Sequence, residues 1–564
     1  MKKLPYISKI GLITYWALLP WCLSAQTQDP YTGMWEGNFM EQFKTVILLD
    51  QVDGSGYAGK IIMYSGENRI QDDELSKITI ENRTLSFDIA AKESSFKGTF
   101  NEMKTELSGN FVFPDNTKHP LTVRKFEKDS AALEATAPPE KERLKLNFPA
   151  EELKSEFREL IDKLKKYHPR LYSYTSEVSF DNQVNEILSN INSDLGIEEY
   201  YLKIAPLVAS VECSHTGIRL PREYQQSNYE HALYFPLELY VCNNKAYCLS
   251  APASPGVDLA PGSEIRAINN WPVSEIIEEL LALIPSEGNC MSSKYQVLNR
   301  DFHSYFHMLD HSDRFLVEYS LANAMGSVQL EACRYDRVRQ DEHSPLPMRP
   351  YSFHRKSNPE FGVLEVSSFG IRNMEEYFAF LDSTFLLIRD ANIPNLLVDL
   401  RGNQGGHPIF AAQLFSYLTS SDFTYFQRNP DAQEFEPLYH AMEPNQHHYN
   451  GNIYVLVNGE CLSTTGHLIS LLKYYTGALF IGEEPGSSFL CNDMSIQLKL
   501  PITGMEVNIP RTTFVTAVSG FTEEEPFPLD YEVDISVQDL LSGTDTYKTY
   551  VYELVNGKNQ LVRF

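Results

Sequence analysis

Residues 453–475 read IYVLVNGECLSTTGHLISLLKYY. The run 453–457 has the apolar, β-branched composition of a buried strand, and the apolar spacing after it predicts a helix over 464–475. Ser463 then falls in the turn between them, where unpaired backbone N–H groups and the helix dipole favour developing negative charge. The turn therefore suits a nucleophilic hydroxyl, although serine is also an ordinary helix N-cap.

The segments around this turn predict an α/β core over residues 351–564. Short apolar strands alternate with helical segments, which is typical of a largely buried sheet. The expected strands are 362–366, 396–400, 453–457 and 479–482, and the expected helices are 375–388, 408–418 and 464–475.

A second motif, DLRGNQGG at residues 399–406, closes one of these strands with a glycine pair. Gly405 and Gly406 have no Cβ, so backbone N–H groups there can approach a substrate closely. The alternative is a tight turn held by a structural Asp–Arg pair. Glycine pairs are common, and taken singly the motif favours this alternative.

A nucleophilic serine needs a base, and three histidines are candidates. His467 lies four residues after Ser463, His407 adjoins the glycine pair, and His215 follows Ser214 in a polar break. The spacing along the chain does not choose among them. His467 and His407 could equally be polar surface groups.

Three further histidines, His303, His307 and His311, recur at helical spacing and could ligate a metal. No well-placed carboxylate accompanies them, so a solvated helix face is the preferred interpretation. We therefore expect no metal and no cofactor.

The cysteines leave two interpretations open. Cys242 and Cys248 flank a predicted hairpin turn, so they could form a disulfide between its strands or remain buried thiols. No paired CxxC spacing of a zinc site is present.

The N-terminus predicts export. Residues 1–25 combine lysines, a short apolar run and a small residue at Ala25, as in a secretory signal peptide. We expect a periplasmic or extracellular protein with no membrane span after cleavage, because no second segment is long and apolar enough to cross a bilayer.

Four further segments precede the α/β core. Residues 26–127 contain short alternating runs typical of an antiparallel, barrel-like β-domain, and Gly33-x-Trp35 resembles a lipocalin-type entrance. Residues 128–146 are rich in Ala, Pro and charge and predict a linker. Residues 147–229 predict a helical domain, and residues 230–350 resemble a PDZ-like module.

Composition excludes several classes of protein. The 564 residues are 43% hydrophobic and 22% charged, which is ordinary globular usage rather than that of a disordered or polytopic membrane protein. Lys and Arg total 48 against 75 Asp and Glu, giving a net charge of −27. This charge repels nucleic acid, so we expect no nucleic-acid partner.

Together the motifs resemble the C-terminal processing peptidase and tricorn protease family. The resemblance covers roughly residues 150–545. It rests on the order of Ser214-His215-Thr216, the PDZ-like part, the 399–406 motif, and Asn458 with Ser463. It implies a multidomain α+β protein with a crotonase-like serine peptidase core.

The resemblance also implies roles for individual residues. Ser463 matches the nucleophile, while Thr464 and the Gly405–Gly406 pair match the two halves of the oxyanion hole. Ser488 stands where Ser-Lys peptidases have their lysine, whereas Ser214-His215 match the serine and histidine of the tricorn-like branch.

In that branch a glutamate shortly before a Pro-Asp element orients the histidine through the serine hydroxyl. The corresponding candidates are Glu523, Glu524 and Glu525, ahead of Pro528-Leu529-Asp530. The resemblance does not choose among the three.

The preferred hypothesis is an exported serine endopeptidase that acts on a peptide or protein substrate. Ser463 would be the nucleophile. His215 would be the general base, because an imidazole with its ordinary pKa of ~6.5 can take the hydroxyl proton at neutral pH. The alternative is a non-catalytic binding protein of the same fold for an apolar ligand or peptide. A scaffold with a decayed site is a third possibility.

Overall fold

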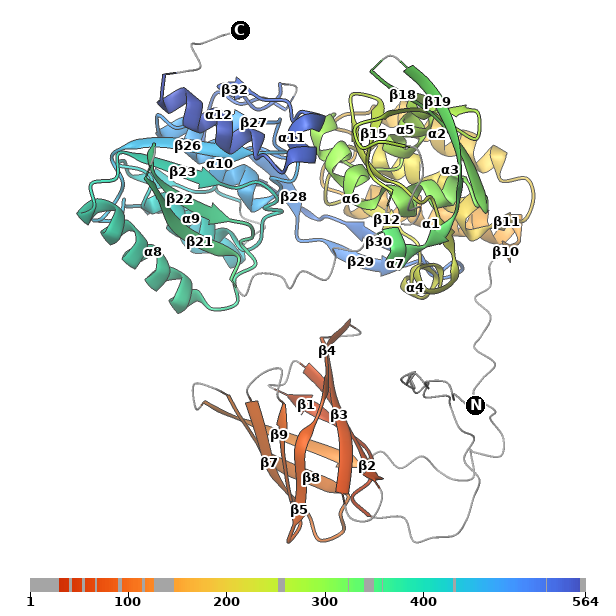
Figure 1. The fold of residues 1–564 in the computed structure, drawn as a ribbon, viewed down its shortest axis with the longest axis vertical. Helices are drawn as coiled ribbons and strands as arrows, with labels where there is room; N and C mark the ends of the chain where they lie inside the picture. Colours follow the sequence, from red (N-terminus) through yellow and green to blue (C-terminus); the bar gives the residue numbers. More distant parts are fainter. Residues whose placement is uncertain are drawn as a thin grey trace, which may run out of the picture. The chain divides into compact units, whose positions relative to one another are not determined.

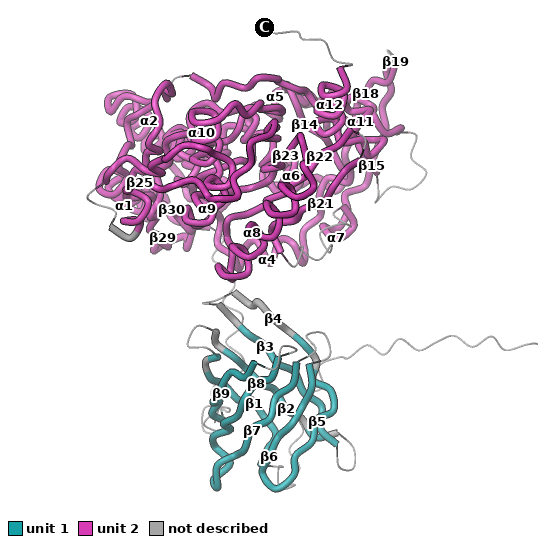
Figure 2. The backbone as a smooth tube through the Cα atoms, turned by 90° about the vertical axis from the view of Figure 1, so that its left-hand side faces the viewer, with its two compact units in different colours: residues 1–141 teal, residues 142–564 magenta. Residues whose placement is uncertain are grey.

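The chain divides into two compact units, Met1–Lys141 and Glu142–Phe564 (Figure 2). The computed structural model describes residues 30–39, 43–52, 56–65, 68–89, 94–113, 117–125, 147–251, 259–322, 324–338, 349–357, 359–429, 433–523 and 525–557. The predicted signal peptide and the linker over 128–146 lie outside the described residues.

The first unit is a nearly closed antiparallel sheet, as the alternating pattern predicts. Its nine strands follow the order β4-β3-β2-β1-β9-β8-β7-β6-β5, so β1 pairs with β9 and the ends of the path are consecutive strands. The strands are β1 Gly33–Phe39, β2 Phe43–Val52, β3 Gly56–Ser65, β4 Asn68–Glu74, β5 Ser76–Glu81, β6 Thr84–Ile89, β7 Ser94–Phe100, β8 Glu106–Val112 and β9 Lys118–Lys125.

The interior of this sheet is filled by aromatic side chains. Trp35, Phe87, Phe96 and Phe111 are almost completely buried, and Phe96 packs against both Phe87 and Phe111. Along β6 and β7, buried residues alternate with more exposed ones, because successive side chains of a strand point to opposite faces of the sheet.

The second unit begins with a helical part, in agreement with the periodicity of residues 147–229. Its elements are β10 Asn147–Phe148, α1 Ala150–Tyr167, α2 Glu177–Asn190, β11 Leu195–Gly196, α3 Ile197–Ala209, β12 Gly217–Arg219 and α4 Arg222–His231.

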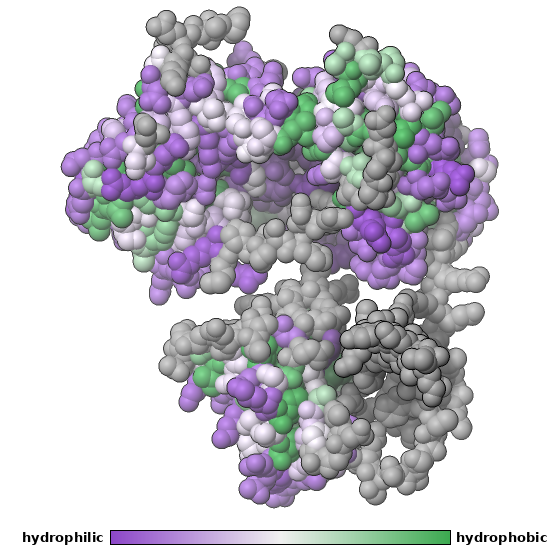
Figure 3. Space-filling view, viewed as in Figure 1, coloured by the Kyte–Doolittle hydropathy of each residue, from purple (hydrophilic) through white to green (hydrophobic). Residues whose placement is uncertain are grey.

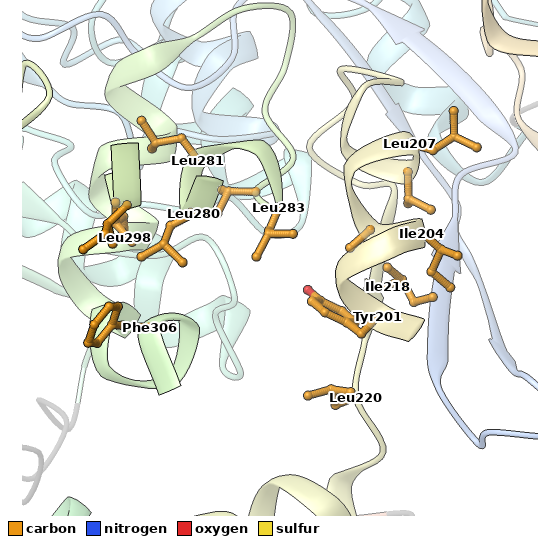
Figure 4. Close-up of a cluster of buried hydrophobic side chains, with 14 of the residues drawn as sticks. Tyr201, Ile204, Leu207, Ile218, Leu220, Leu280, Leu281, Leu283, Leu298 and Phe306 are labelled. Carbon is orange, nitrogen blue, oxygen red and sulfur yellow. The ribbon is translucent and has the colours of Figure 1, made fainter. Parts of the chain in front are cut away.

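A mixed segment follows, in which β14-β15-β16-β18-β19 form one sheet. Its elements are β13 Leu233–Tyr234, β14 Glu238–Cys242, β15 Lys245–Ser250, β16 Glu264–Ile268, β17 Trp271–Pro272, α5 Val273–Ala282, α6 Met291–Leu309, β18 Arg314–Leu321, β19 Ala324–Glu331, β20 Cys333–Arg334 and α7 Tyr335–Val338. One continuous apolar core joins both segments, with side chains from α3, α5 and α6 (Figure 4). The PDZ-like likeness stays a prediction.

The α/β core is built on the sheet β21-β22-β23-β26-β27-β32, in which all neighbours after β22 are parallel (Figure 1). Its elements are β21 Tyr351–Ser357, β22 Glu360–Val366, α8 Met374–Asp390, β23 Asn395–Asp399, α9 Pro408–Ser416, β24 Phe423–Thr424, a 3-10 helix Gln433–Tyr439, β25 Ala441–Met442, β26 Asn452–Val457, α10 Thr464–Tyr475, β27 Leu479–Gly482, β28 Leu490–Asp493, β29 Ile496–Lys499, β30 Glu506–Ile509, β31 Thr512–Val515, β32 Tyr531–Glu532, α11 Val537–Ser542 and α12 Thr546–Val555.

Both faces of this sheet are covered, which explains why its strands are apolar throughout. Leu364, Val398 and Val455 pack with α8, α9 and α10, while their neighbours Val363, Leu397 and Leu456 pack with α12. Hydrophilic side chains dominate the outer surface of the core that faces the viewer in Figure 3. No described helix is long and apolar enough to span a membrane.

The hairpin β29–β30 leaves the core and joins the helical part (Figure 1). β30 pairs with β12, with Gly217 opposite Asn508. At the tip, the buried carboxylate of Glu156 on α1 accepts hydrogen bonds from Ile502 N, Thr503 N and Thr503 Oγ1 at 2.5, 2.9 and 2.8 Å. Two distant parts of the sequence are thereby fixed to each other.

The structure chooses between the two cysteine interpretations: Cys242 and Cys248 are free thiols, and Cys248 lies opposite Leu239 in the hairpin. The expected solvated face of histidines is wrong for His303 and His307, which are buried, with His303 Nε2 2.8 Å from Leu237 O, whereas His311 is exposed. Helical spacing alone did not reveal that a strand segment covers this face.

The Glu156 contact yields a stability prediction. Glu156→Ala leaves three donors at the hairpin tip without their acceptor, so we expect the unfolding free energy of the second unit to fall by about 3 kcal/mol. Urea unfolding followed by fluorescence measures this change. Glu159→Ala, an exposed site on the same helix, should change it by less than about 0.5 kcal/mol. Equal stability of both variants would contradict the anchoring role.

Candidate active site

The turn between β26 and α10 holds Ser463 in a strained conformation. Its φ and ψ are 55° and −122°, which a residue with a Cβ rarely adopts. The side chain is 7% exposed and makes no N-cap hydrogen bond. Helix capping therefore does not explain this serine, and its hydroxyl remains available for chemistry.

His215 reaches the same place from the helical part. It follows α3 and a turn at Glu212, which has a φ of 54°. Asn508 Nδ2 donates a hydrogen bond to the carbonyl oxygen of His215 at 2.6 Å, next to the β12–β30 pairing. The hairpin β29–β30 of the α/β core thus holds His215 near Ser463.

Cys491 on β28 contacts both groups. Its Sγ lies 3.7 Å from Ser463 Oγ and 3.7 Å from His215 Nδ1. On the other side of the ring, His215 Nε2 lies 4.0 Å from Asp493 Oδ2. Burial lowers the pKa of His215, and the Asp493 carboxylate partly offsets this effect. The imidazole is therefore neutral at pH 7 and able to accept a proton.

Glu287, in the loop between α5 and α6, holds the residue before the histidine. Its Oε2 accepts from Ser214 N at 3.2 Å and from Ser214 Oγ at 2.9 Å, and Ser214 Oγ lies 3.2 Å from His215 Nδ1. Burial raises the pKa of Glu287 to about 7. The sequence analysis missed this residue, because nothing local marks a loop glutamate as the partner of a serine 73 positions away.

The glutamates expected from the resemblance are placed differently. Glu523 accepts from Arg170 Nη2 through both carboxylate oxygens, at 2.7 and 2.6 Å. In the structure Glu287 makes the contact with Ser214, whereas Glu523 pairs with Arg170. Glu524 lies outside the described residues.

The glycine pair packs directly against the serine turn. Gly405 and Gly406 have φ values of +97° and +140°, and a Cβ on Gly405 would lie 2.9 Å from Ser463 Cβ and 3.0 Å from Thr464 N. The amide of Gly405 donates to Asn403 Oδ1 at 2.9 Å. Among the described residues, the amides of Gly406 and Thr464 have no such partner and are available as oxyanion donors.

The Asp–Arg pair of the same motif is structural. Arg401 donates to Asp399 at 2.6 and 2.8 Å and to Asp545 at the start of α12 at 2.8 and 2.9 Å. The structure therefore confirms the Asp–Arg interpretation at one end of the motif, while an oxyanion role for the glycine pair stays a prediction.

The other candidate bases lie elsewhere. His407 caps α9 by accepting from Ile409 N at 3.2 Å. His467 is buried beside the rings of Tyr425 and Phe426, and burial lowers its pKa to about 3. Of the three candidate histidines, His215 contacts Cys491 Sγ, which also contacts Ser463 Oγ.

The described residues contain no group of three His, Cys, Asp or Glu arranged to hold a metal ion.

An α/β core with a strained serine, a nearby neutral imidazole and free backbone amides defines a class: a serine-type peptidase. Residues 360–532 match the sequence model described as peptidase family S41. The family likeness that the motifs predict is thus confirmed over residues 360–532. A search of curated protein sequences found no match.

Solved structures agree on the fold. Mature CPAF complexed with lactacystin is 12% identical with a TM-score of 0.53, over 72% of this chain and 99% of that one. A second structure of mature CPAF is 12% identical with a TM-score of 0.52, over 73% of this chain and 99% of that one. The photosystem II D1 C-terminal processing protease is 15% identical with a TM-score of 0.35, over 70% and 98%. At 12% identity the two CPAF structures show a likeness of fold.

The raised pKa of Glu287 predicts a pH-dependent stability. Between its ordinary value of 4.5 and about 7, the folded chain binds more protons at Glu287 than the unfolded chain, so stability falls as the pH rises through this window. Glu287→Gln removes the titration. We expect the unfolding free energy of the variant relative to wild type to rise by roughly 2–3 kcal/mol from pH 5 to pH 8.

Urea unfolding at the two pH values tests this expectation. The ionisable groups around Glu287 stay the same in both proteins; they are Arg170, Tyr174, Cys213, Cys491 and Glu523. A pH-independent difference between the two proteins would contradict the raised pKa.

Proposed function

We propose that the chain is an exported serine endopeptidase that hydrolyses peptide bonds with Ser463 as nucleophile and His215 as general base. One observation carries the proposal: a strained, uncapped serine and a neutral histidine both contact the Cys491 sulfur, beside two unpaired amides. Hydrolysis by a serine nucleophile uses a hydroxyl, a neutral imidazole and amide donors of this kind.

In the proposed reaction Ser463 Oγ attacks the scissile carbonyl and His215 takes its proton. The amides of Gly406 and Thr464 receive the negative charge that develops on the carbonyl oxygen. Each such donor is worth on the order of 3 kcal/mol in the transition state. His215 then protonates the leaving amine, and water repeats the sequence to release the acyl group.

Ser214 and Glu287 would orient the base. The Ser214 hydroxyl donates to Glu287, which leaves its oxygen beside His215 Nδ1. His215 Nδ1–H would donate to the Ser214 oxygen, and rotation of the ring would bring Nε2, which lies 4.0 Å from Asp493 Oδ2, to Ser463 Oγ as the proton acceptor. Catalytic hydrogen bonds often tighten in this way only when substrate binds.

We also propose export, on the basis of the signal-like residues 1–25. The substrate would be an extended or C-terminal peptide segment. The segment over residues 230–350 would select it by strand addition, a recognition mode that gives affinity through main-chain hydrogen bonds.

Replacement of the nucleophile is the direct test. Wild type should react with a fluorophosphonate probe and cleave casein, whereas Ser463→Ala should lose labelling and at least 1000-fold in kcat. A non-catalytic binding protein would leave the probe unreacted in both forms. Equal turnover in both forms would eliminate Ser463 as the nucleophile.

The glycine pair gives an independent prediction. A methyl group on Gly405 would meet Ser463 Cβ and Leu462 O, each at 2.9 Å, at a φ that disfavours alanine. We expect Gly405→Ala to lower kcat by about 100-fold or more through the displaced oxyanion donors, with a smaller change in KM. Steady-state kinetics on a fluorogenic peptide measures both. Gly477→Ala is the control, because a Cβ there meets nothing within 4 Å.

A further inference from the structure

A cavity of about 300 Å³ lies beside the site, between the loops around Glu287, Glu484 and Glu523. This volume is at the lower end of the range of ligand pockets, ~300–1,000 Å³. The mechanism above uses Glu287, which is one of its lining residues, but it does not use the cavity.

The cavity is separated from the nucleophile by one wall, since Ser463 is not among its lining residues. Its wall over residues 484–490 crosses the first turn of α10, since a Cβ on Gly466 would lie 2.6 Å from Ser487 Oγ and 2.7 Å from Ser488 O. The same wall ends at Leu490, one residue before the Cys491 that contacts Ser463. A group in the cavity would therefore belong to a substrate residue close to the scissile bond.

The charged side chains that line the cavity are all acidic. Four glutamates contribute to the lining, namely Glu287, Glu484, Glu523 and Glu525. Among the described residues Arg170 forms an ion pair with Glu523, and its charge also acts on Glu287. Burial raises the pKa of both Glu287 and Glu484, which opposes their ionisation.

Buried acceptors in the lining lack partners. Glu287 uses Oε2 for Ser214, while its Oε1 is shielded from solvent and has no hydrogen-bond partner. Ser487 is 4% exposed, and its Oγ is also without a partner. Such groups are costly unless a ligand supplies the missing donors.

A metal ion does not fit, because no three ligating side chains among the described residues converge on one point. An ammonium or guanidinium group does fit, since it carries several N–H donors and a charge that spaced carboxylates can share.

We propose that this pocket binds a cationic side chain, Lys or Arg, of the peptide whose scissile bond faces Ser463. The proposal rests on the peptidase function above and assigns its specificity. Because Glu287 both lines the pocket and holds Ser214, the bound cation would also stabilise the carboxylate that orients His215.

Peptide binding to the full-length Ser463→Ala protein tests the proposal without catalysis. The probes are pairs of fluorescein-labelled peptides. The two members of a pair differ at one position, which holds lysine in one peptide and its uncharged counterpart norleucine in the other, and the position differs from pair to pair. At one position lysine should bind at least 10-fold more tightly than norleucine. Adding Glu484→Gln should reduce this preference below 3-fold, and adding Glu331→Gln, at an exposed site on β19, should leave it unchanged.

Equal binding of lysine and norleucine peptides at every position would overturn the proposal, as would a preference that survives both Glu484→Gln and Glu287→Gln. The wild-type protein separates this failure from that of the peptidase function. Hydrolysis without a basic preference contradicts only the pocket, whereas lysine-selective binding without any hydrolysis contradicts only the nucleophile.

Discussion

The candidate site depends on the pairing of two short strands, β12 and β30. The Asn508–His215 hydrogen bond at this pairing joins residues 293 positions apart. The histidine belongs to the helical part and the serine to the α/β core, so this pairing helps to fix their separation, together with contacts such as that of Gln296 Nε2 with Glu483 Oε2 at 2.9 Å. Glu156 fixes the other end of the same hairpin, so a buried carboxylate far from the chemistry supports the site's geometry.

Burial then determines the protonation states of the ionisable groups in and around the site. It keeps the imidazoles of His215 and His467 neutral and opposes ionisation of Glu287. A neutral imidazole is needed to take a proton from the serine, whereas a reluctant carboxylate gains most from any positive charge placed beside it. The same desolvation thus accounts for the base and for the acidic pocket next to it.

Strain is concentrated where the chemistry is proposed. Ser463 adopts a backbone conformation that costs of order 1–3 kcal/mol, and the packing of β26 and α10 on either side holds it there. Gly405 and Gly406 occur where the adjoining loop must pass within contact distance of that turn. The free-energy cost of the strained backbone at these positions is offset by the burial of the central sheet, whose strands are apolar on both faces.

The sequence by itself determined the local elements. The helix predicted over 464–475 matches α10, and the strand predicted over 453–457 matches β26 within one residue. Periodicity and turn chemistry are properties of neighbouring residues, so they also located Ser463 and the glycine pair. Only the tertiary structure decided that His215 rather than His467 contacts Cys491, and that Glu287 rather than Glu523 contacts Ser214. Those choices depend on which surfaces long-range pairing buries together, and no pattern along the chain records them.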